Sequence, residues 1–234
     1  GTNTGLHTNF KLDGMGESII LANSSGVIID QILFPAQTAM VSMGRTPDGG
    51  SNWVYFKSVT KGSANSSTSF TGKAPAPNFS VTGGFYSGTQ SVTLSTTLSG
   101  ATIRYTTNGS MPTESSTAYS SPISVTSTTA IKARVFHNNY IPSKAVCHTY
   151  FINERNFDLP VISLTFNDED FNSDQTGIYV EGTNGVSGNC VDYPINWNQD
   201  WERKIYFEYF DASKKRQVGA NGGVQLVGGC SRQW

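Results

Sequence analysis

The chain has 234 residues, of which 14% are charged and 37% hydrophobic, and its formal net charge is −1. Short clusters of Gly, Ser, Thr and Asn favour many turns and few long helices, so the composition predicts a mainly β protein. A net charge near zero provides no surplus of Lys and Arg for phosphate contacts, so we expect no nucleic-acid partner. No apolar run approaches about 18 residues, so no transmembrane segment is expected.

The first segment, residues 1–66, contains the apolar runs SIILAN, VIIDQILF and NWVYF, which are separated by turn residues. Apolar residues alternate along the second run, at Val27, Ile29, Ile32 and Phe34. This alternation predicts strands with one buried face. We interpret this segment as part of a β-sandwich. Small polar residues and Pro then predominate without an apolar period, which predicts a linker at residues 67–76.

The second segment, residues 77–153, repeats short strands with turn signals at close spacing: SVTLST, TIRYTTNGS, ISVTSTTAIKARVFH and AVCHTYFIN. This pattern predicts a small immunoglobulin-like sandwich. Asn108 and Gly109 are suited to the backbone angles of a tight turn after the strand that contains Tyr105.

The third segment, residues 154–234, is predicted to be a partial mixed α/β segment. LPVISLTF is typical of a strand buried on both faces, and IYFEYF predicts another strand. Asn167, followed by acidic residues, predicts a helix start. The same acids suggest a calcium loop, but an EF-hand requires Gly and Glu where this chain has Ser173 and Tyr179.

The cysteines, Cys147, Cys190 and Cys230, lack the paired spacing of a zinc site. We expect Cys147 to be a buried thiol. Cys190 and Cys230 are either incidental thiols or a disulfide, which would suit an oxidising compartment.

Each segment resembles a known family. The motifs GVIIDQILFP and SMGRTPDGGSNWVYF in residues 1–66 resemble the bacterial lamin-tail domain, which implies a partial sandwich. The pattern IRYTTNGSMPTESSTAYSSPISV is similar to the domain at the C-terminus of chitobiases and β-hexosaminidases. In those enzymes that domain is an appendage, so the resemblance implies no glycosidase activity here.

The third segment, with NWNQDWERKIYFEYF and GGVQLVGGCSRQW, resembles the opening of the CotH family, whose fuller members are atypical kinase-like enzymes. The resemblance implies that nucleotide- and metal-binding acids lie beyond Trp234. The Gly-rich stretch GANGGVQLVGG matches neither phosphate-loop motif. Arg232 is the nearest residue that could touch a phosphate in the intact family domain.

Three aromatic residues are candidates for stacking on sugar rings, namely Tyr193, Trp197 and Trp201. The alternative that stays open is that these residues pack in the core. The acidic residues of the same region are Glu181, Asp192, Asp200 and Glu202. We interpret them as solvated loop residues. The histidines are isolated and no nucleophile signature accompanies them: His7, His137 and His148. We therefore predict no catalytic, cofactor-binding or metal-binding residue and no cofactor.

These observations predict a non-catalytic scaffold or adhesion segment of a secreted or cell-surface multidomain bacterial protein, whose partner is a cell-surface glycan or protein. Two alternatives stay open. The chain is the N-terminal portion of a CotH-type kinase-like enzyme, or it is a carbohydrate-binding module.

Overall fold

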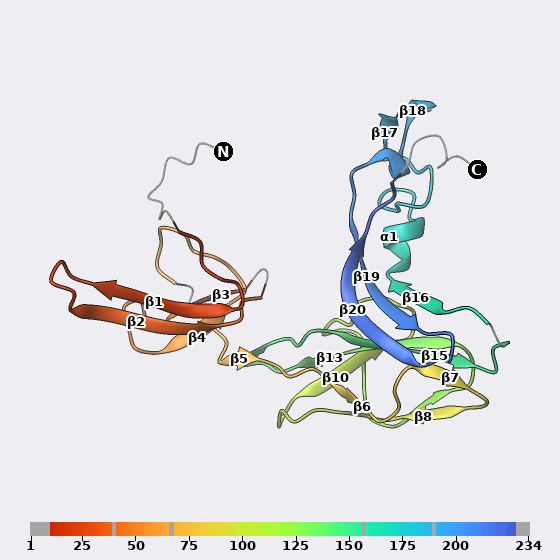
Figure 1. Cartoon of the computed structure of the whole chain (residues 1–234), viewed down its shortest axis with the longest axis horizontal. Coiled ribbons are helices and arrows are strands. Elements are labelled where there is room, and N and C mark those ends of the chain that lie inside the picture. The colour runs from red at the N-terminus through yellow and green to blue at the C-terminus, as the bar shows by residue number, and fades with distance from the viewer. Residues whose placement is uncertain (1–9, 39–40, 66–67, 156–157, 189–190, 228–234) are drawn as a thin grey trace. The chain divides into compact units, whose positions relative to one another are not determined.

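The computed structural model in Figure 1 describes residues 10–38, 41–65, 68–155, 158–188 and 191–227. The chain divides into two compact units, Gly1–Gly72 and Lys73–Trp234. The molecule is mainly β, which confirms the predicted fold class. The division lies within the predicted linker, whereas the boundary predicted between residues 153 and 154 lies inside the second unit. That residues 77–153 and 154–234 are separate domains stays a prediction.

The first unit contains two antiparallel hairpins, and β5 (Gly72–Lys73) lies at the division between the units. The hairpins are formed by β1 (Gly16–Ala22) with β2 (Ile28–Pro35), and by β3 (Ser42–Arg45) with β4 (Trp53–Phe56). In the first turn, the Asn23 side-chain oxygen accepts hydrogen bonds from the Ser25 and Val27 amides, at 3.0 and 2.9 Å. The short strands predicted between turn residues in this segment are therefore present.

The prediction of one buried face on the second run is wrong at its first half. Phe34 is buried at 8% exposure, but Val27 and Ile29 are 60% and 63% exposed. Among the residues that the structure describes, β1 and β2 pair with each other and with no further strand, so nothing extends this sheet on either side. The alternation in the sequence correctly predicted the strand, but it did not indicate how many of the strand's residues are buried by other segments.

The second unit begins with a β-sandwich built from short strands. One layer is a five-stranded sheet in the order β11-β10-β13-β15-β7, and the facing layer is made of the pairs β12-β8 and β6-β9. The strand bounds are β6 (Asn78–Phe79), β7 (Gly84–Tyr86), β8 (Gln90–Val92), β9 (Leu94–Ser95), β10 (Thr102–Thr106), β11 (Thr117–Ala118), β12 (Ile123–Val125), β13 (Thr129–Phe136), β14 (Tyr140–Ile141) and β15 (Val146–Ile152).

The sandwich core is formed by alternate residues of these strands. Ile131 and Tyr150 from the large sheet and Val92 from the facing layer are 0% exposed. The opposite face of β15 carries Cys147 and Thr149, because successive side chains of a strand point to opposite faces. That outer face contacts the next part of the chain.

The remainder of the unit is a three-stranded antiparallel sheet in the order β16-β19-β20, with a small hairpin and two short helices. Its elements are β16 (Val161–Phe166), α1 (Asp168–Asn172), β17 (Val186–Gly188), β18 (Val191–Ile195), the 3-10 helix η1 (Asn196–Asn198), β19 (Arg203–Phe210) and β20 (Arg216–Val224). No helix among the described residues has the length and apolar character needed to cross a membrane.

Two local predictions for this segment have different outcomes. The helix start is confirmed, since Asn167 occupies the N-cap position of α1, although its side chain makes no capping hydrogen bond. The prediction that the LPVISLTF strand is buried on both faces is wrong, because Ile162 and Leu164 of β16 are 58% and 44% exposed. Thr165 is buried, so only one face of this edge strand is covered.

Candidate functional site

The three aromatic residues predicted to stack on sugars do not form one exposed surface. Tyr193 on β18 is 52% exposed, whereas Trp197 in η1 is 5% exposed and belongs to the packed interior. Trp201 is half-buried, and the Arg203 guanidinium lies 4.5 Å from the centre of its ring. A stacking role for Tyr193 and Trp201 stays a prediction.

Asn196, which no sequence motif indicates, organises the loop around Trp197. Its side chain is fully buried and donates hydrogen bonds to the carbonyls of Asp174 and Gly177, at 2.9 and 3.2 Å. Its side-chain oxygen accepts the Asn184 amide at 3.0 Å. A buried amide with all these bonds fixes three chain segments.

The acidic residues singled out in the sequence do not converge on one point. The Asn172 side chain donates to Asp168 at 2.6 Å, and the Thr183 hydroxyl donates to Asp174 at 2.8 Å. Asp200 accepts a hydrogen bond from Gln225, while Glu181 and Glu202 are solvent-accessible loop residues. Within the described residues, no three His, Cys, Asp or Glu side chains are placed to share a metal ion. Arg232, Cys190, Cys230 and His7 lie outside the described residues, as does the Asp192 side chain.

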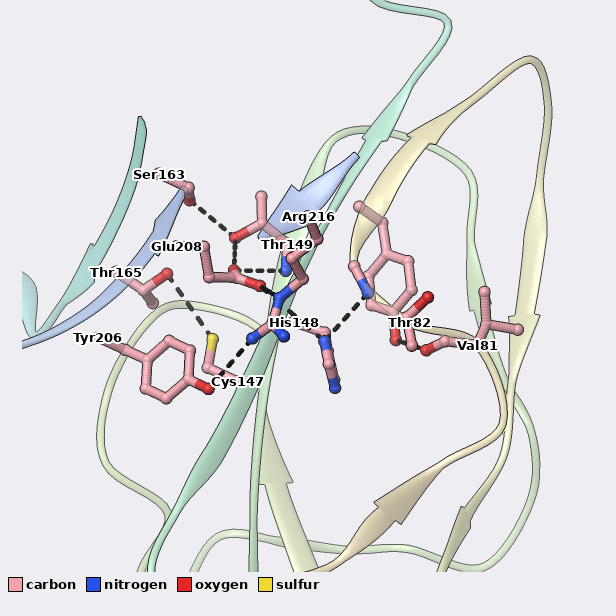
Figure 2. A network of polar contacts seen from close by, with 12 residues as sticks. Val81, Thr82, Cys147, His148, Thr149, Ser163, Thr165, Tyr206, Glu208 and Arg216 are labelled. Atoms are coloured by element: carbon pink, nitrogen blue, oxygen red, sulfur yellow. Dashed lines mark hydrogen bonds and ion pairs between the residues drawn. The ribbon is translucent and has the colours of Figure 1, made fainter. Parts of the chain in front are cut away.

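A different cluster is brought together by β15, β16, β19 and β20, and its centre is Glu208 (Figure 2). The Glu208 carboxylate is 0% exposed. One oxygen accepts Arg216 Nε at 2.7 Å, and the other accepts the amide and the hydroxyl of Thr149, at 2.8 and 2.6 Å. Thr149 also bonds Ser163 across 2.8 Å. Glu208 therefore joins the outer face of the sandwich to the following sheet.

His148 and Cys147 are on adjacent positions of β15 and point to opposite faces of it. His148 Nδ1 accepts the Gly83 amide at 3.0 Å, so this nitrogen carries no proton. Burial, and then the nearby Arg216 charge, lower the pKa of His148 to about 4. The 3.9 Å approach of Nδ1 to Glu208 is therefore not an ion pair near neutral pH.

The Cys147 thiol is fully buried and donates to the Thr165 hydroxyl at 3.7 Å. Burial, and then the charge of Glu208, raise the pKa of this thiol to about 12. The expectation of a buried thiol is confirmed. Because the thiolate is the nucleophilic form, a thiol in this state is inert at neutral pH.

A second contact across the same junction is the close approach of Gly109, in the tight turn of the sandwich, to the end of β16. Lys132, which is 4% exposed, donates from Nζ to the Gly109 carbonyl at 2.6 Å. Gly109 has φ +82° and lies against the Phe166 carbonyl at the end of β16. The Asn108 side-chain oxygen accepts the Ser110 amide at 3.2 Å. The predicted turn thus provides a packing surface for the next sheet in addition to reversing the chain.

The cluster around Glu208 contains a thiol, an imidazole and a carboxylate, but their geometry does not support nucleophilic catalysis. That chemistry requires the base to accept the proton of the nucleophile and to be oriented by the acid. Here the thiol bonds Thr165, the imidazole bonds Gly83 and the carboxylate bonds Arg216 and Thr149. The arrangement stabilises and orients two sheets.

Comparison with protein families identifies one segment of this chain. Residues 81–147 match the chitobiase/beta-hexosaminidase C-terminal domain, an immunoglobulin-like, non-catalytic module. The match includes Gly109, Lys132 and Cys147, and it ends just before His148 and Thr149. Glu208 and Arg216 lie outside it. No curated protein matches the chain.

Proposed function

We propose that the chain is a non-catalytic scaffold or adhesion segment of a secreted or cell-surface bacterial protein, in which the chitobiase-type module is fixed to the sheet that follows it. The match at residues 81–147 supports the non-catalytic part of the proposal. The single observation that carries the scaffold role is the fully buried Glu208, whose partners come from both sides of the junction.

The physical reason is that the buried Glu208 carboxylate would lose part of its hydrogen-bond partners if the two sheets separated. A buried charge is tolerated only when it is paired and hydrogen-bonded, and removing one partner typically costs about 3–5 kcal/mol. Separation of the two sheets would leave Glu208 without Thr149 and Thr149 without Ser163. The module and the sheet are therefore expected to move together.

We extend the proposal to the two flanking segments. The hairpins of the first unit and the motif SMGRTPDGGSNWVYF support a partial lamin-tail-like domain at residues 1–66. The strands and short helix of residues 154–234, with NWNQDWERKIYFEYF, support the N-terminal portion of a CotH-like domain. Both assignments are proposals about the origin of these segments.

Native-state hydrogen exchange of the whole chain tests the scaffold role. We expect the amides of β13 and β15 to exchange with the same free energy of opening as those of β16 and β19, because the two sheets open together. In the Glu208→Gln variant, which removes the charge paired with Arg216, we expect β16 and β19 to exchange at a lower free energy than β15.

The matched control is Glu169→Gln, which makes the same change on the exposed face of α1. This control should leave all four strands unchanged. Independent opening of the two sheets in the wild-type chain, or equal behaviour of the two variants, would contradict the proposed scaffold role.

A further inference from the structure

An open groove of about 500 Å³ lies on the chitobiase-type module, away from the Glu208 network. It is lined by residues of β10, of the turn after β13 and of the loop before β11, and the residues that matter are Thr102, Arg104, Glu114, Phe136, Asn138 and Asn139. A volume of this size is in the range of small-molecule sites, roughly 300–1,000 Å³.

The groove is held in shape by the strands beneath it. Arg104 is paired with Ala118 on one side and with Arg134 on the other, and its Nη1 donates to the Ser116 carbonyl at 2.6 Å. Phe136, at 8% exposure, is one of the lining residues. In the adjoining turn, the Asn139 amide donates to His137 Nδ1 at 3.1 Å.

Several polar groups of this groove have unused hydrogen-bonding capacity. Within the described part of the chain, the Glu114 carboxylate and the side-chain amides of Asn138 and Asn139 make no hydrogen bond or ion pair with the protein. A second groove, of similar volume, differs in this respect. Its hydroxyls on Thr149, Ser163 and Thr165 are bonded to other protein groups.

The chemistry of the lining selects the class of ligand. One cation, Arg104, and one anion, Glu114, face the groove, so a phosphate or polyanion meets no charge surplus. Both edges of β10 are paired, by β11 and β13, so an extended peptide cannot add as a strand. Planar amide, carboxylate and guanidinium groups can instead pair with adjacent hydroxyls of a neutral ligand.

The geometry points to this groove as a binding site for a neutral saccharide, recognised by Arg104, Glu114, Asn138 and Asn139. The inference deepens the adhesion part of the proposed function and names its ligand class. It does not depend on the rigid junction at Glu208. It differs from the stacking site predicted at Tyr193, Trp197 and Trp201, because it uses hydrogen-bonding groups of the module itself.

Titration of the isotope-labelled whole chain with glucose, galactose, mannose and N-acetylglucosamine, followed by amide NMR shifts, tests the inference. A small open site with few hydrogen bonds should bind with a Kd on the order of 1 mM. We expect at least one of these sugars to cause saturable shifts in the amides of Thr102, Glu114, Asn138 and Asn139.

Glu114→Gln replaces a charged acceptor by a neutral amide, and Asn138→Ala removes an amide, so each is expected to weaken this binding about tenfold. The controls are Glu169→Gln and Asn78→Ala, which make the same chemical changes at exposed positions outside the groove. Absence of saturable shifts up to about 50 mM sugar, far above the expected Kd, would overturn the inference. So would shifts that the groove variants leave unchanged.

A failed sugar titration would leave the hydrogen-exchange coupling across Glu208 intact, and independent opening of the sheets would leave the sugar titration intact. The two experiments therefore distinguish failure of the saccharide site from failure of the scaffold role.

Discussion

Protonation of His148 would break the hydrogen bond that holds its ring in the sandwich. Its ring contacts Phe79 edge-on, with the ring centres 4.6 Å apart, and its Nδ1 accepts the Gly83 amide. Protonation would turn that acceptor into a donor facing another donor, beside the Arg216 charge. The sandwich is therefore built around the neutral imidazole.

The pH dependence of stability follows from this burial. The folded-state pKa of His148 is about 4, below the unfolded value of about 6.5. As pH falls below about 6.5, the unfolded chain binds a proton that the folded chain excludes, so the free energy of unfolding decreases. We expect a decrease of about 2 kcal/mol between pH 7 and pH 5 from this group.

Urea unfolding, followed by the fluorescence of the buried Trp197 with the other tryptophans replaced by Phe, measures this decrease. His148→Asn keeps an acceptor near Nδ1 and should flatten the slope between pH 7 and pH 5. His137→Asn, in the turn after β13, should retain it. An equal slope in wild type and His148→Asn would show that other groups cause the acid sensitivity.

At the scale of elements, the turn after β10 determines how closely β16 can approach the sandwich. Gly109 has φ +82°, and a Cβ at this position would collide with the Phe166 carbonyl oxygen. Gly100 provides a matched comparison, since its φ of +71° is similar but its added Cβ would meet only the edge of the His137 ring, at 3.6 Å from Nε2 and 3.9 Å from Cδ2.

We expect Gly109→Ala to lower the free energy of unfolding of the second unit by about 2 kcal/mol more than Gly100→Ala. Both variants strain the backbone, by roughly 1 kcal/mol, but only the first also forces β16 away from the turn. Urea unfolding followed by Trp197 fluorescence compares the two. Equal losses would mean that β16 shifts freely and that the contact with Phe166 is unimportant.

The elements also show what the sequence could predict. Strands and turns depend on neighbouring residues, so SIILAN, VIIDQILF and the Asn167 helix start were recognised from local patterns. Coverage of a face depends on distant segments, which is why the exposure of Val27, Ile29 and Ile162 was predicted wrongly. An apolar pattern in the sequence predicts a strand, but it does not indicate which other segment of the chain packs on that strand.

The Glu208 site was missed for the same reason. Its partner Thr149 is 59 residues away in the sequence, and no local pattern connects them. One signal was present: a single acid stands among aromatic residues in IYFEYF, on the face that the structure buries with Tyr206 and Phe210. An acid on such a face requires a paired cation, and Arg216 on the adjacent strand provides it.

For the whole molecule, the sharpest alternative to a scaffold is a kinase-like activity. Phosphoryl transfer needs a phosphate cradle, a cation clamp and acids that hold a metal. The acids of the described residues are dispersed, and Arg216 is committed to Glu208. We therefore expect calorimetric titration of this chain with Mg-ATP to give no saturable heat at millimolar nucleotide.

Adenosine without phosphates is the matched control ligand in that titration. Saturable binding of Mg-ATP but not of adenosine would place a phosphate-dependent site in this chain and would contradict the non-catalytic assignment. Binding of both would indicate only an aromatic surface that accepts the base.

The parallel pairing of β7 with β15 determines the order in which this protein can assemble during synthesis. Tyr150 pairs with Gly84, the first residue of β7. The strand β7 is the first of the large sheet along the chain, and it has no parallel partner until the ribosome has made β15, the last strand of that sheet. Closing a contact over such a chain separation is slow. The emerging module thus exposes an unpaired edge until residue 152 is available, and Glu208 acquires its partner Arg216 later still. During this interval the unpaired strand edge makes the nascent chain prone to aggregation.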